Sequence, residues 1–356
     1  MLNVAVIGAG KFGLHILNVL SQLERTTGEC KLVAFAEIDE ALLAGRRKEF
    51  GVAGYADYAQ MLRQERVDAV AVATPDPFHR PPALLAVRMG KHVLVEKPMD
   101  LTVEGCREME EEARRNGVLL QVDFHKRYDP YHREIAKLVR GGKLGRIEYG
   151  YVHMEDRIDI PSEWFPGWAP KSSPVWFLGI HFIDLARWIL QSDGEQAYAT
   201  GVRSKLKSIG VDTYDSVSAH VRFRNGATVS FDCSWILPKE FEAPVNQGIR
   251  LVGENGIAEC DTQDRGLRSC IAGEGMRTHN LGFFSEGVDR YGAKSYGGYG
   301  FDSIADFVRN VRALRNGATL ETVRQSGTAL AEDGIEATKI AVAIHRSLET
   351  GEVVGI

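Results

Sequence analysis

Short apolar runs rich in β-branched residues alternate with amphipathic stretches along the first third of the chain. The apolar runs predict buried parallel strands at 3–7, 31–36, 68–74, 92–95 and 119–124. The amphipathic stretches predict helices at 12–20, 39–49, 57–64, 83–89 and 102–116. Asp39, Asp57 and Thr102 stand at the starts of three of these helices and are candidate N-caps. Strands that alternate with helices predict a doubly wound parallel sheet with helices on both faces.

The pattern changes after residue 124. Helices are expected at 130–141 and, strongly apolar, at 175–190. Strand patterns dominate the region between and after them, at 147–154, 197–202, 215–223, 227–235 and 248–252. Asn225-Gly226 separates two of these strands and is a strong hairpin signal. Helices at 301–314 and 328–348 close the chain, and 270–300 receives no assignment.

These patterns predict an α/β protein of two domains. Residues 1–124 form an N-terminal Rossmann-type domain with a doubly wound parallel sheet. Residues 125–356 form a C-terminal α+β domain with a large, mostly antiparallel open sheet and helices on one face. A length of 356 residues is enough for two hydrophobic cores.

Composition narrows the class of protein. The content of 44% hydrophobic and 26% charged residues is ordinary for a globular chain, and a net charge of −5 predicts no nucleic-acid or membrane partner. No apolar run approaches the ~20 residues that span a bilayer, and the chain enters a strand directly after Met1, so no signal peptide is expected. Five scattered cysteines without a CxxC pair favour reduced thiols in a cytoplasmic protein over disulfides or a metal site.

The first candidate site is the sequence Gly8-x-Gly10-x-x-Gly13 between the first strand and the first helix. Gly8 suits a tight turn, Gly10 the close approach of a pyrophosphate, and Gly13 the packing of helix on strand. The helix N-terminus, with Lys11 and Phe12, then offers N–H groups and a positive dipole end to phosphates. The motif favours a dinucleotide site over a tight turn that binds no ligand.

Polar residues follow the other strands at their carboxyl ends, where ligands bind in doubly wound sheets. Glu37, Thr74, Lys97 and the segment from residue 125 are therefore expected along one crevice. An acid at the place of Glu37 accepts hydrogen bonds from the adenosine ribose and repels a 2′-phosphate, which favours NAD over NADP. Arg46 and Arg47 lie in the next helix and are expected to be too far away to compensate.

Four motifs in order over about 180 residues carry a family resemblance. They are Gly8-x-Gly10-x-x-Gly13, Thr74-Pro75-x-x-x-His79, a run of residues 90–98 that ends in Glu96-Lys97-Pro98, and Gly179-x-His181-x-x-Asp184. Together they resemble the glucose–fructose oxidoreductase / inositol dehydrogenase (Gfo/Idh/MocA) family, and Asp333-Gly334 fits the same pattern. The resemblance implies NAD(P)-dependent oxidation or reduction of a CH–OH group in a sugar, cyclitol or related polyol. It also implies a homodimer or homotetramer built through the open face of the C-terminal sheet.

The resemblance also assigns roles to single residues. The implied cofactor-binding set is Gly8, Gly10, Lys11, Phe12, Gly13, Glu37, Thr74, Pro75, His79, Glu96 and Lys97. Oxidising an alcohol requires a base for the O–H proton, and the Glu-Lys-Pro motif of the family places its catalytic lysine at Lys97. A solvated loop lysine is the alternative.

His181 is the second catalytic candidate. A histidine in an apolar helix is usually a core residue, but the family motif favours a substrate contact or a proton shuttle. Asp184, three residues on, either orients the imidazole or braces the helix.

Phe177 departs from the family pattern, in which an aspartate often stands one helical turn before the histidine. Phenylalanine cannot relay a proton, so the proton path must differ, and an apolar ring near His181 favours a neutral imidazole. Such a ring is also expected to select a less polar substrate or a ring orientation different from that of inositol. The full expected substrate-binding set is Lys126, Arg127, Asp156, Trp168, Phe177 and His181. The alternatives are surface charges for the basic pair and core or interface packing for Trp168 and the neighbouring Trp164 and Trp176.

Three functions remain open at this point. The first is a polyol or sugar dehydrogenase or reductase. The second is an NAD-dependent glycosidase, which oxidises its sugar only transiently and gives no net NADH. The third is a ligand-sensing protein without catalysis, which the loss of the aspartate at 177 keeps open and the retention of Lys97 and His181 opposes.

Overall fold

The structure is a computed structural model that describes residues 1–261, 267–271, 275–280 and 282–356. The chain forms two compact units. The first contains Met1–Tyr128 and Phe283–Ile335, and the second contains Asp129–Gly282 and Glu336–Ile356.

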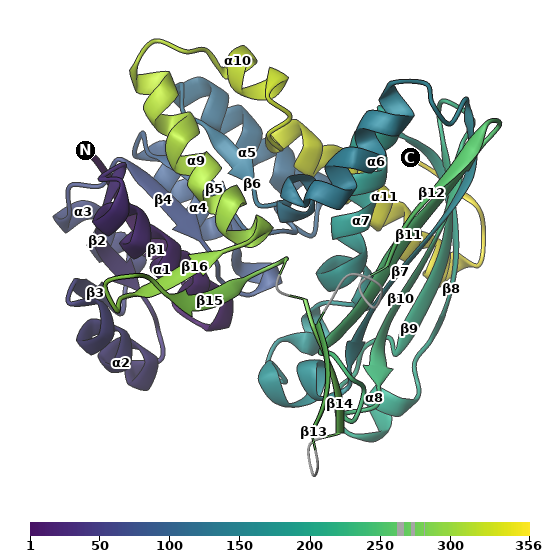
Figure 1. The fold of residues 1–356 in the computed structure, drawn as a ribbon, viewed down its shortest axis with the longest axis horizontal. Helices are drawn as coiled ribbons and strands as arrows, with labels where there is room; N and C mark the ends of the chain where they lie inside the picture. Colours follow the sequence, from purple (N-terminus) through teal and green to yellow (C-terminus); the bar gives the residue numbers. More distant parts are fainter. Residues whose placement is uncertain (262–266, 272–274, 281) are drawn as a thin grey trace. The chain divides into compact units, whose positions relative to one another are not determined.

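The first unit is built on a six-stranded parallel sheet in the order β3-β2-β1-β4-β5-β6 (Figure 1). Its strands are β1 (Leu2–Ile7), β2 (Cys30–Ala36), β3 (Ala53–Tyr55), β4 (Ala69–Val72), β5 (His92–Val95) and β6 (Leu120–Val122). The order reverses between β1 and β4, which is the switch point where ligands bind in such sheets. The expected doubly wound parallel sheet is confirmed.

Helices α1 to α5 connect these strands, and their starts follow the capping chemistry of the sequence. They are α1 (Lys11–Thr26), α2 (Glu40–Phe50), α3 (Tyr58–Gln64), α4 (Arg80–Arg88) and α5 (Val103–Asn116), with short 3₁₀ turns η1 (Asp76–Phe78) and η2 (His125–Tyr128). Asp39 accepts the N–H of Leu42 at 2.9 Å, and Asp57 accepts that of Ala59 at 2.8 Å. Thr102 accepts the N–H of Gly105 at 3.0 Å, so all three predicted N-caps are confirmed.

A late segment of the chain returns to the first unit. It contains β15 (Ser285–Val288), β16 (Lys294–Gly297), α9 (Tyr299–Arg315) and α10 (Leu320–Gln325). Phe307 and Val308 of α9 join the same buried apolar cluster as Ile16 and Leu20 of α1. The single domain boundary predicted between 124 and 125 does not account for this return. The apolar face of α9 packs with α1, which lies almost 300 residues earlier in the chain.

The second unit is built on a seven-stranded sheet in the order β12-β11-β7-β10-β9-β8-β17. Its strands are β7 (Ile147–Arg157), β8 (Gly194–Val202), β9 (Ser216–Phe223), β10 (Thr228–Leu237), β11 (Val245–Gly253), β12 (Gly256–Asp261) and β17 (Val354–Gly355). Only the β10–β7 pair is parallel among these strands, so the expected, mostly antiparallel sheet is confirmed. The predicted hairpin joins β9 to β10 through Gly226, whose φ of 93° favours glycine.

One face of this sheet is covered by helices (Figure 1). The helical segments of this unit are α6 (Pro130–Arg140), η3 (Ile160–Trp164), η4 (Ala169–Lys171), η5 (Val175–Gly179), α7 (Ile180–Leu190), α8 (Lys205–Ser208) and the end of α11 (Ala331–Thr350). The expected helix at 175–190 is a π-helical turn, η5, followed by α7. A buried row of side chains, Val152, Phe231 and Ile249, crosses three strands in register on the covered face.

The opposite face of the sheet carries exposed aromatic side chains. Tyr149, Tyr151 and Tyr198 are each more than 40% exposed. In the segment 270–300, which the sequence left unassigned, the described parts hold the end of β13 (Leu267–Ile271), β14 (Gly275–His279) and the β15–β16 pair. Within the ranges given above, no helix has the length and apolarity to cross a bilayer.

The glycine turn gives a stability prediction with a built-in control. A Cβ at Gly13 would stand 1.9 Å from the carbonyl oxygen of Gly8, whereas a Cβ at Gly10 meets no atom of the described chain within 4 Å. Gly13→Ala should therefore lower the free energy of unfolding by ~1–3 kcal/mol through overpacking, and Gly10→Ala should leave it nearly unchanged. Thermal unfolding of both variants checks this, and equal melting temperatures would contradict it.

Candidate active site

The turn after β1 is pressed against β4 on one side and open on the other. Gly8 has a φ of 87°, and a Cβ there would lie 2.5 Å from the carbonyl oxygen of Ala73 at the end of β4. Gly10 has free space beside its Cα, as the absence of any described atom within 4 Å of a Cβ shows. The turn is therefore fixed in place by Gly8 and Gly13 and leaves room for a ligand at Gly10.

The N-terminus of α1 completes this turn. Its N-cap is Gly10, with no capping side chain and no acidic residue in the first turn. Lys11 is exposed, and the ring of Phe12 stacks on His125 with 6.1 Å between ring centroids. A helix start with uncapped N–H groups and a basic first residue fits the phosphates of a dinucleotide.

Glu37 joins the glycine turn to the start of α2. Its Oε2 accepts the N–H of Ala9 at 2.8 Å, and its Oε1 accepts the N–H of Asp39 at 3.0 Å. Only 9% of Glu37 is exposed. These two N–H donors hold the buried carboxylate in place at the end of β2, where the sequence predicted an acid for the ribose hydroxyls.

Arg46 lies closer to this position than expected. Its Nε approaches the carbonyl oxygen of Ala9 at 3.4 Å, so the guanidinium reaches the glycine turn, and its Nη1 pairs with Glu49 at 2.8 Å. Arg47 instead donates to the carbonyl oxygen of Gly54. The long side chain of Arg46 thus reaches from α2 to residue 9, whereas the expectation that neither arginine compensates for Glu37 stays a prediction.

The segment after β4 is held by buried hydrogen bonds. The ring of His79, 1% exposed, lies between the carbonyl oxygens of Pro98 (2.6 Å from Nδ1) and Thr74 (2.7 Å from Nε2). Burial lowers the pKa of His79. Thr74 Oγ1 donates to the carbonyl oxygen of Phe78 at 2.9 Å, and Pro75 opens η1. His79 thus braces the Thr74 loop against the Glu-Lys-Pro loop, and cofactor contact by these residues stays a prediction.

The ends of β5 and β6 bring a lysine and two carboxyl groups together. Glu96 and Lys97 follow β5 and are 6% and 7% exposed, and Asp123 follows β6 and is 1% exposed. Burial, and then the neighbouring Asp123, raise the pKa of Glu96 well above its usual value. Burial also raises the pKa of Asp123. Asp123 was missed in the sequence, although its place at a strand end beside Glu96 is the signal that points to it.

Lys126 and Arg127 lie in η2 and are 2% and 3% exposed, so neither is a surface charge. The Arg127 guanidinium pairs with Asp333 at 2.9 Å and donates to the carbonyl oxygen of Gly327 at 3.3 Å. Gly334, next in the chain, lies against Met99, since a Cβ there would stand 3.0 Å from its Sδ. Arg127 therefore holds η2 to the start of α11, and a substrate role for the basic pair stays a prediction.

In the second unit, the expected substrate residues lie on the helix-covered side of the sheet. Asp156, 1% exposed, stands near the end of β7, and His181, 4% exposed, lies in the first turn of α7. Asp184 is wholly buried in the same helix. Gly179 lets η5 approach the sheet, because a Cβ there would lie 2.9 Å from the Sγ of Cys233 on β10. This contact gives the glycine of the Gly179-x-His181 motif a physical reason.

Phe177 belongs to a cluster of four aromatic rings. Its ring centroid lies 4.9 Å from that of Phe165, 5.7 Å from that of Trp235 and 5.9 Å from that of Trp168. Phe165 and Trp168 stack with 4.3 Å between centroids. Trp235 is fully buried, and its Nε1–H finds no acceptor within the described ranges. Phe165 and Trp235 were not singled out in the sequence, because strand and loop residues so far apart give no local signal.

Trp176 and Trp164 take other places. The ring of Trp176 is 7% exposed and stacks on His345 at 4.9 Å, which favours core packing. Trp164 is 41% exposed and ends η3.

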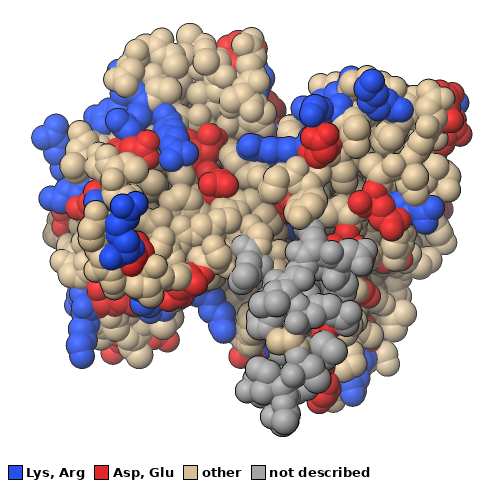
Figure 2. Space-filling view, viewed as in Figure 1, with Lys and Arg blue, Asp and Glu red and all other residues tan. Residues whose placement is uncertain are grey.

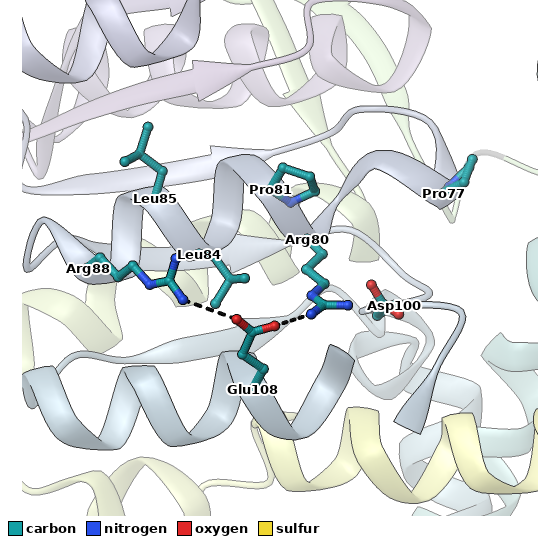
Figure 3. Close-up of a pocket in the computed structure, with 8 residues that line it drawn as sticks. All are labelled: Pro77, Arg80, Pro81, Leu84, Leu85, Arg88, Asp100 and Glu108. Atoms are coloured by element: carbon teal, nitrogen blue, oxygen red, sulfur yellow. Dashed lines mark hydrogen bonds and ion pairs between the residues drawn. The ribbon is translucent and has the colours of Figure 1, made fainter. Parts of the chain in front are cut away.

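A depression between α4 and α5 is lined by side chains of both helices and by Pro77 and Asp100 (Figure 3). Glu108 at its edge pairs with both Arg80 and Arg88, so the charges there compensate one another. On the face shown in Figure 2, basic and acidic side chains are likewise interspersed, in keeping with the small net charge of −5.

The structure thus gathers the predicted residues within each unit. In the first unit the glycine turn, Glu37, the Thr74 loop, Glu96 and Lys97 share the carboxyl edge of the parallel sheet. In the second unit Trp168 and Phe177 belong to one aromatic cluster, and His181 follows in the helix that continues from η5.

Comparison with known proteins agrees with this arrangement. Residues 2–124 match the model of an oxidoreductase family with an NAD-binding Rossmann fold (GFO_IDH_MocA), and residues 132–259 match the GFO/IDH/MocA C-terminal domain. Inositol 2-dehydrogenase of Rubrobacter xylanophilus is 30% identical over 261 residues, which are 72% of this chain and 70% of the relative. Myo-inositol 2-dehydrogenase of Thermotoga maritima is 26% identical over 98% of this chain and 96% of its own length.

A solved structure extends the similarity to the whole fold. The crystal structure of myo-inositol 2-dehydrogenase from Lactobacillus plantarum matches with a TM-score of 0.79 at 25% identity, over 100% of this chain and 99% of that chain. The motifs, both domain matches and the fold agree, and the chain belongs to the Gfo/Idh/MocA family of oxidoreductases.

Proposed function

We propose that this protein is an NAD-dependent dehydrogenase or reductase for a secondary alcohol or ketone of a sugar, cyclitol or related polyol. The observation that carries the proposal is the edge of the first sheet, where an open glycine turn, a carboxylate and a lysine stand together. The names of the inositol dehydrogenases among the relatives support the substrate class.

The residues present fit a bound NAD. The space at Gly10 and the uncapped start of α1 suit its pyrophosphate, and Glu37 suits the adenosine ribose hydroxyls. Bound NAD supplies the hydride acceptor or donor of the reaction. Arg46 reaches Ala9, and its positive charge is expected to offset part of the repulsion between Glu37 and a 2′-phosphate. Of these two residues, only Glu37 therefore favours NAD over NADP.

Lys97 is proposed as the group that exchanges the hydroxyl proton. An amine side chain can take up and release a proton, and oxidising an alcohol requires such a group within reach of the hydroxyl. Lys97 is 7% exposed at the end of β5, and the His79 brace holds the loop that follows it. His181 is proposed as the second residue in proton transfer, since a neutral imidazole can both accept and donate a proton.

The aromatic cluster is proposed to set the polarity of the substrate. Phe177 stands where related enzymes often have an aspartate, and it is packed with Phe165, Trp168 and Trp235. Aromatic faces bind the C–H face of a sugar or cyclitol ring, and an indole N–H can donate to a hydroxyl at its edge. We therefore expect a substrate with one apolar face.

The exposed tyrosine face of the second sheet is proposed as the surface through which copies of the chain associate into a dimer or tetramer. Tyr149, Tyr151 and Tyr198 give it the aromatic content typical of such interfaces. A monomeric mass by light scattering at micromolar concentration would contradict this assignment.

The function is tested by screening sugars, cyclitols and sugar acids for reduced-nicotinamide absorbance with NAD. Lys97→Met keeps the length of the side chain and removes the ammonium, so turnover on the substrate found should fall ~10²–10⁴-fold, the span of general acid–base catalysis. Lys31→Met, at an exposed lysine on β2, is the matched control and should keep wild-type turnover. Full turnover in Lys97→Met would show that another group exchanges the proton, and cleavage of a glycoside without net NADH would favour a glycosidase.

Cofactor preference depends on Glu37 and Arg46. Glu37→Ala should weaken NAD binding by ~1–3 kcal/mol, the scale of a lost charge-assisted hydrogen bond. Because Arg46 remains beside the turn, the same variant should gain affinity for NADP, and adding Arg46→Ala should remove that gain. Titration of both cofactors measures this, with Arg47→Ala as the control because its guanidinium is engaged by Gly54. Tighter binding of NADP than NAD by the wild type would refute the assignment.

The role of Phe177 is tested by pH–rate profiles of the wild type, His181→Ala and Phe177→Asp. His181→Ala should lower turnover, because it removes a proton-transfer group. Phe177→Asp should change the pH dependence and favour more polar substrates, while NAD affinity stays the same. Three profiles of equal shape and height would exclude both residues from proton transfer.

A further inference from the structure

Two buried carboxyl groups stand side by side at the edge of the first sheet, and the proposed reaction uses neither directly. Glu96 follows β5 and Asp123 follows β6, the neighbouring parallel strand. The N–H of Asp123 donates to the carbonyl oxygen of Val95 at 2.9 Å, which fixes the two residues next to each other. They are 6% and 1% exposed, so both are shielded from bulk solvent.

The surroundings of the pair contain few donors. Glu96 accepts the backbone N–H of Lys97. In the described part of the chain, no N–H donates to Glu96 Oε1 or to either side-chain oxygen of Asp123. The hydroxyl of Ser303 on α9 lies beside Asp123, but it donates to the carbonyl oxygen of Gly300 at 3.2 Å. The register of β5 and β6 continues past Val95 and Val122 and sets Glu96 beside Asp123, so one carboxyl group can hydrogen-bond to the other only when one of them carries a proton.

Another buried carboxylate of the protein, Asp215, has the N–H donors that this pair lacks in the described part of the chain. Asp215 is 2% exposed and accepts three backbone N–H groups, from Ser204 at 2.8 Å, Lys205 at 2.6 Å and Leu206 at 2.7 Å. Both side-chain oxygens of Asp215 therefore have N–H donors, with no need for a second carboxyl group. Glu96 Oε1 and both side-chain oxygens of Asp123 lack such donors among the described residues, and two adjacent buried negative charges repel each other strongly.

We propose that Glu96 and Asp123 share one proton at neutral pH and act together as a single negative charge that positions the charged end of Lys97. The titratable groups around the pair are Lys97 and Tyr128, whose hydroxyl donates to Asp306 at 2.6 Å. One negative charge balances one ammonium, so the lysine is held without an excess of charge in a buried place. The shared proton does not depend on the proposed function, whereas its effect on turnover rests on it.

Infrared spectroscopy tests the shared proton without any activity assay. The wild type at neutral pH should show the C=O band of a protonated carboxylic acid, and ¹³C labelling of aspartate and glutamate carboxyl groups should shift it. Glu96→Gln and Asp123→Asn should each abolish the band, because the new amide donates to the remaining carboxylate. Asp215→Asn, at an equally buried carboxylate with three donors, should leave it in place.

Two results would overturn the proposal. One is the absence of a label-sensitive acid band in the wild type at neutral pH, which needs no variant to fold. The other is a band that persists in both folded variants.

The effect on catalysis has its own readout. With the pair intact, the alkaline limb of the pH–rate profile should contain the loss of the shared proton. Asp123→Asn keeps one negative charge on Glu96 and should lose that transition, while a merely structural change would lower the rate at every pH alike. An unchanged alkaline limb would refute the positioning role even where the infrared band is present. Absence of activity on every polyol would instead refute the proposed function and leave the infrared result standing.

Discussion

The parallel direction of all six strands in the first sheet forces the polar residues that follow them to one edge. Burial there is costly for each charge unless a partner compensates it. Glu37 is compensated by the N–H groups of Ala9 and Asp39, and His79 by two carbonyl oxygens. Glu96 and Asp123 have each other and a nearby lysine. The edge where NAD is proposed to bind is thus also an edge where several buried ionisable groups each depend on a compensating partner.

Much of the first unit could be predicted because its signals are local. Asp39, Asp57 and Thr102 cap their helices through N–H groups two or three residues away, and the glycine turn spans six residues. Contacts between residues far apart in the sequence could not be predicted from such local signals. Arg127 pairs with Asp333, and the reach of Arg46 to Ala9 depends on how α2 lies against the turn. Asp123 was not predicted as a site residue, because its importance depends on Glu96, which follows the neighbouring strand.

The return of Phe283–Ile335 to the first unit shows the same limit at the level of domains. The sequence predicts α9 as a helix from its periodicity, but periodicity does not say which apolar surface the helix will cover. Phe307 and Val308 join the cluster of α1. Gln22 of α1 exchanges two hydrogen bonds with the backbone of Tyr296, at 2.6 and 3.0 Å, which fixes the β15–β16 pair on the same helix. Because residues of Phe283–Ile335 complete the core of the first unit, truncating the chain after residue 124 would expose that cluster.

Phe177 is better understood through its neighbours than as the loss of an acid. An aspartate at this position would place a charge beside Phe165, Trp168 and Trp235, whose ring carbons offer no hydrogen bonds. The buried Nε1–H of Trp235 is one polar group that the aromatic cluster itself contributes, and it lacks an acceptor in the described residues. Phe177 packs with three other aromatic side chains, and loss of one carboxylate would not by itself explain their presence. We therefore interpret the cluster as a consistent apolar surface. The polarity of this part of the second unit is therefore a property of the cluster, and residue 177 alone does not set it.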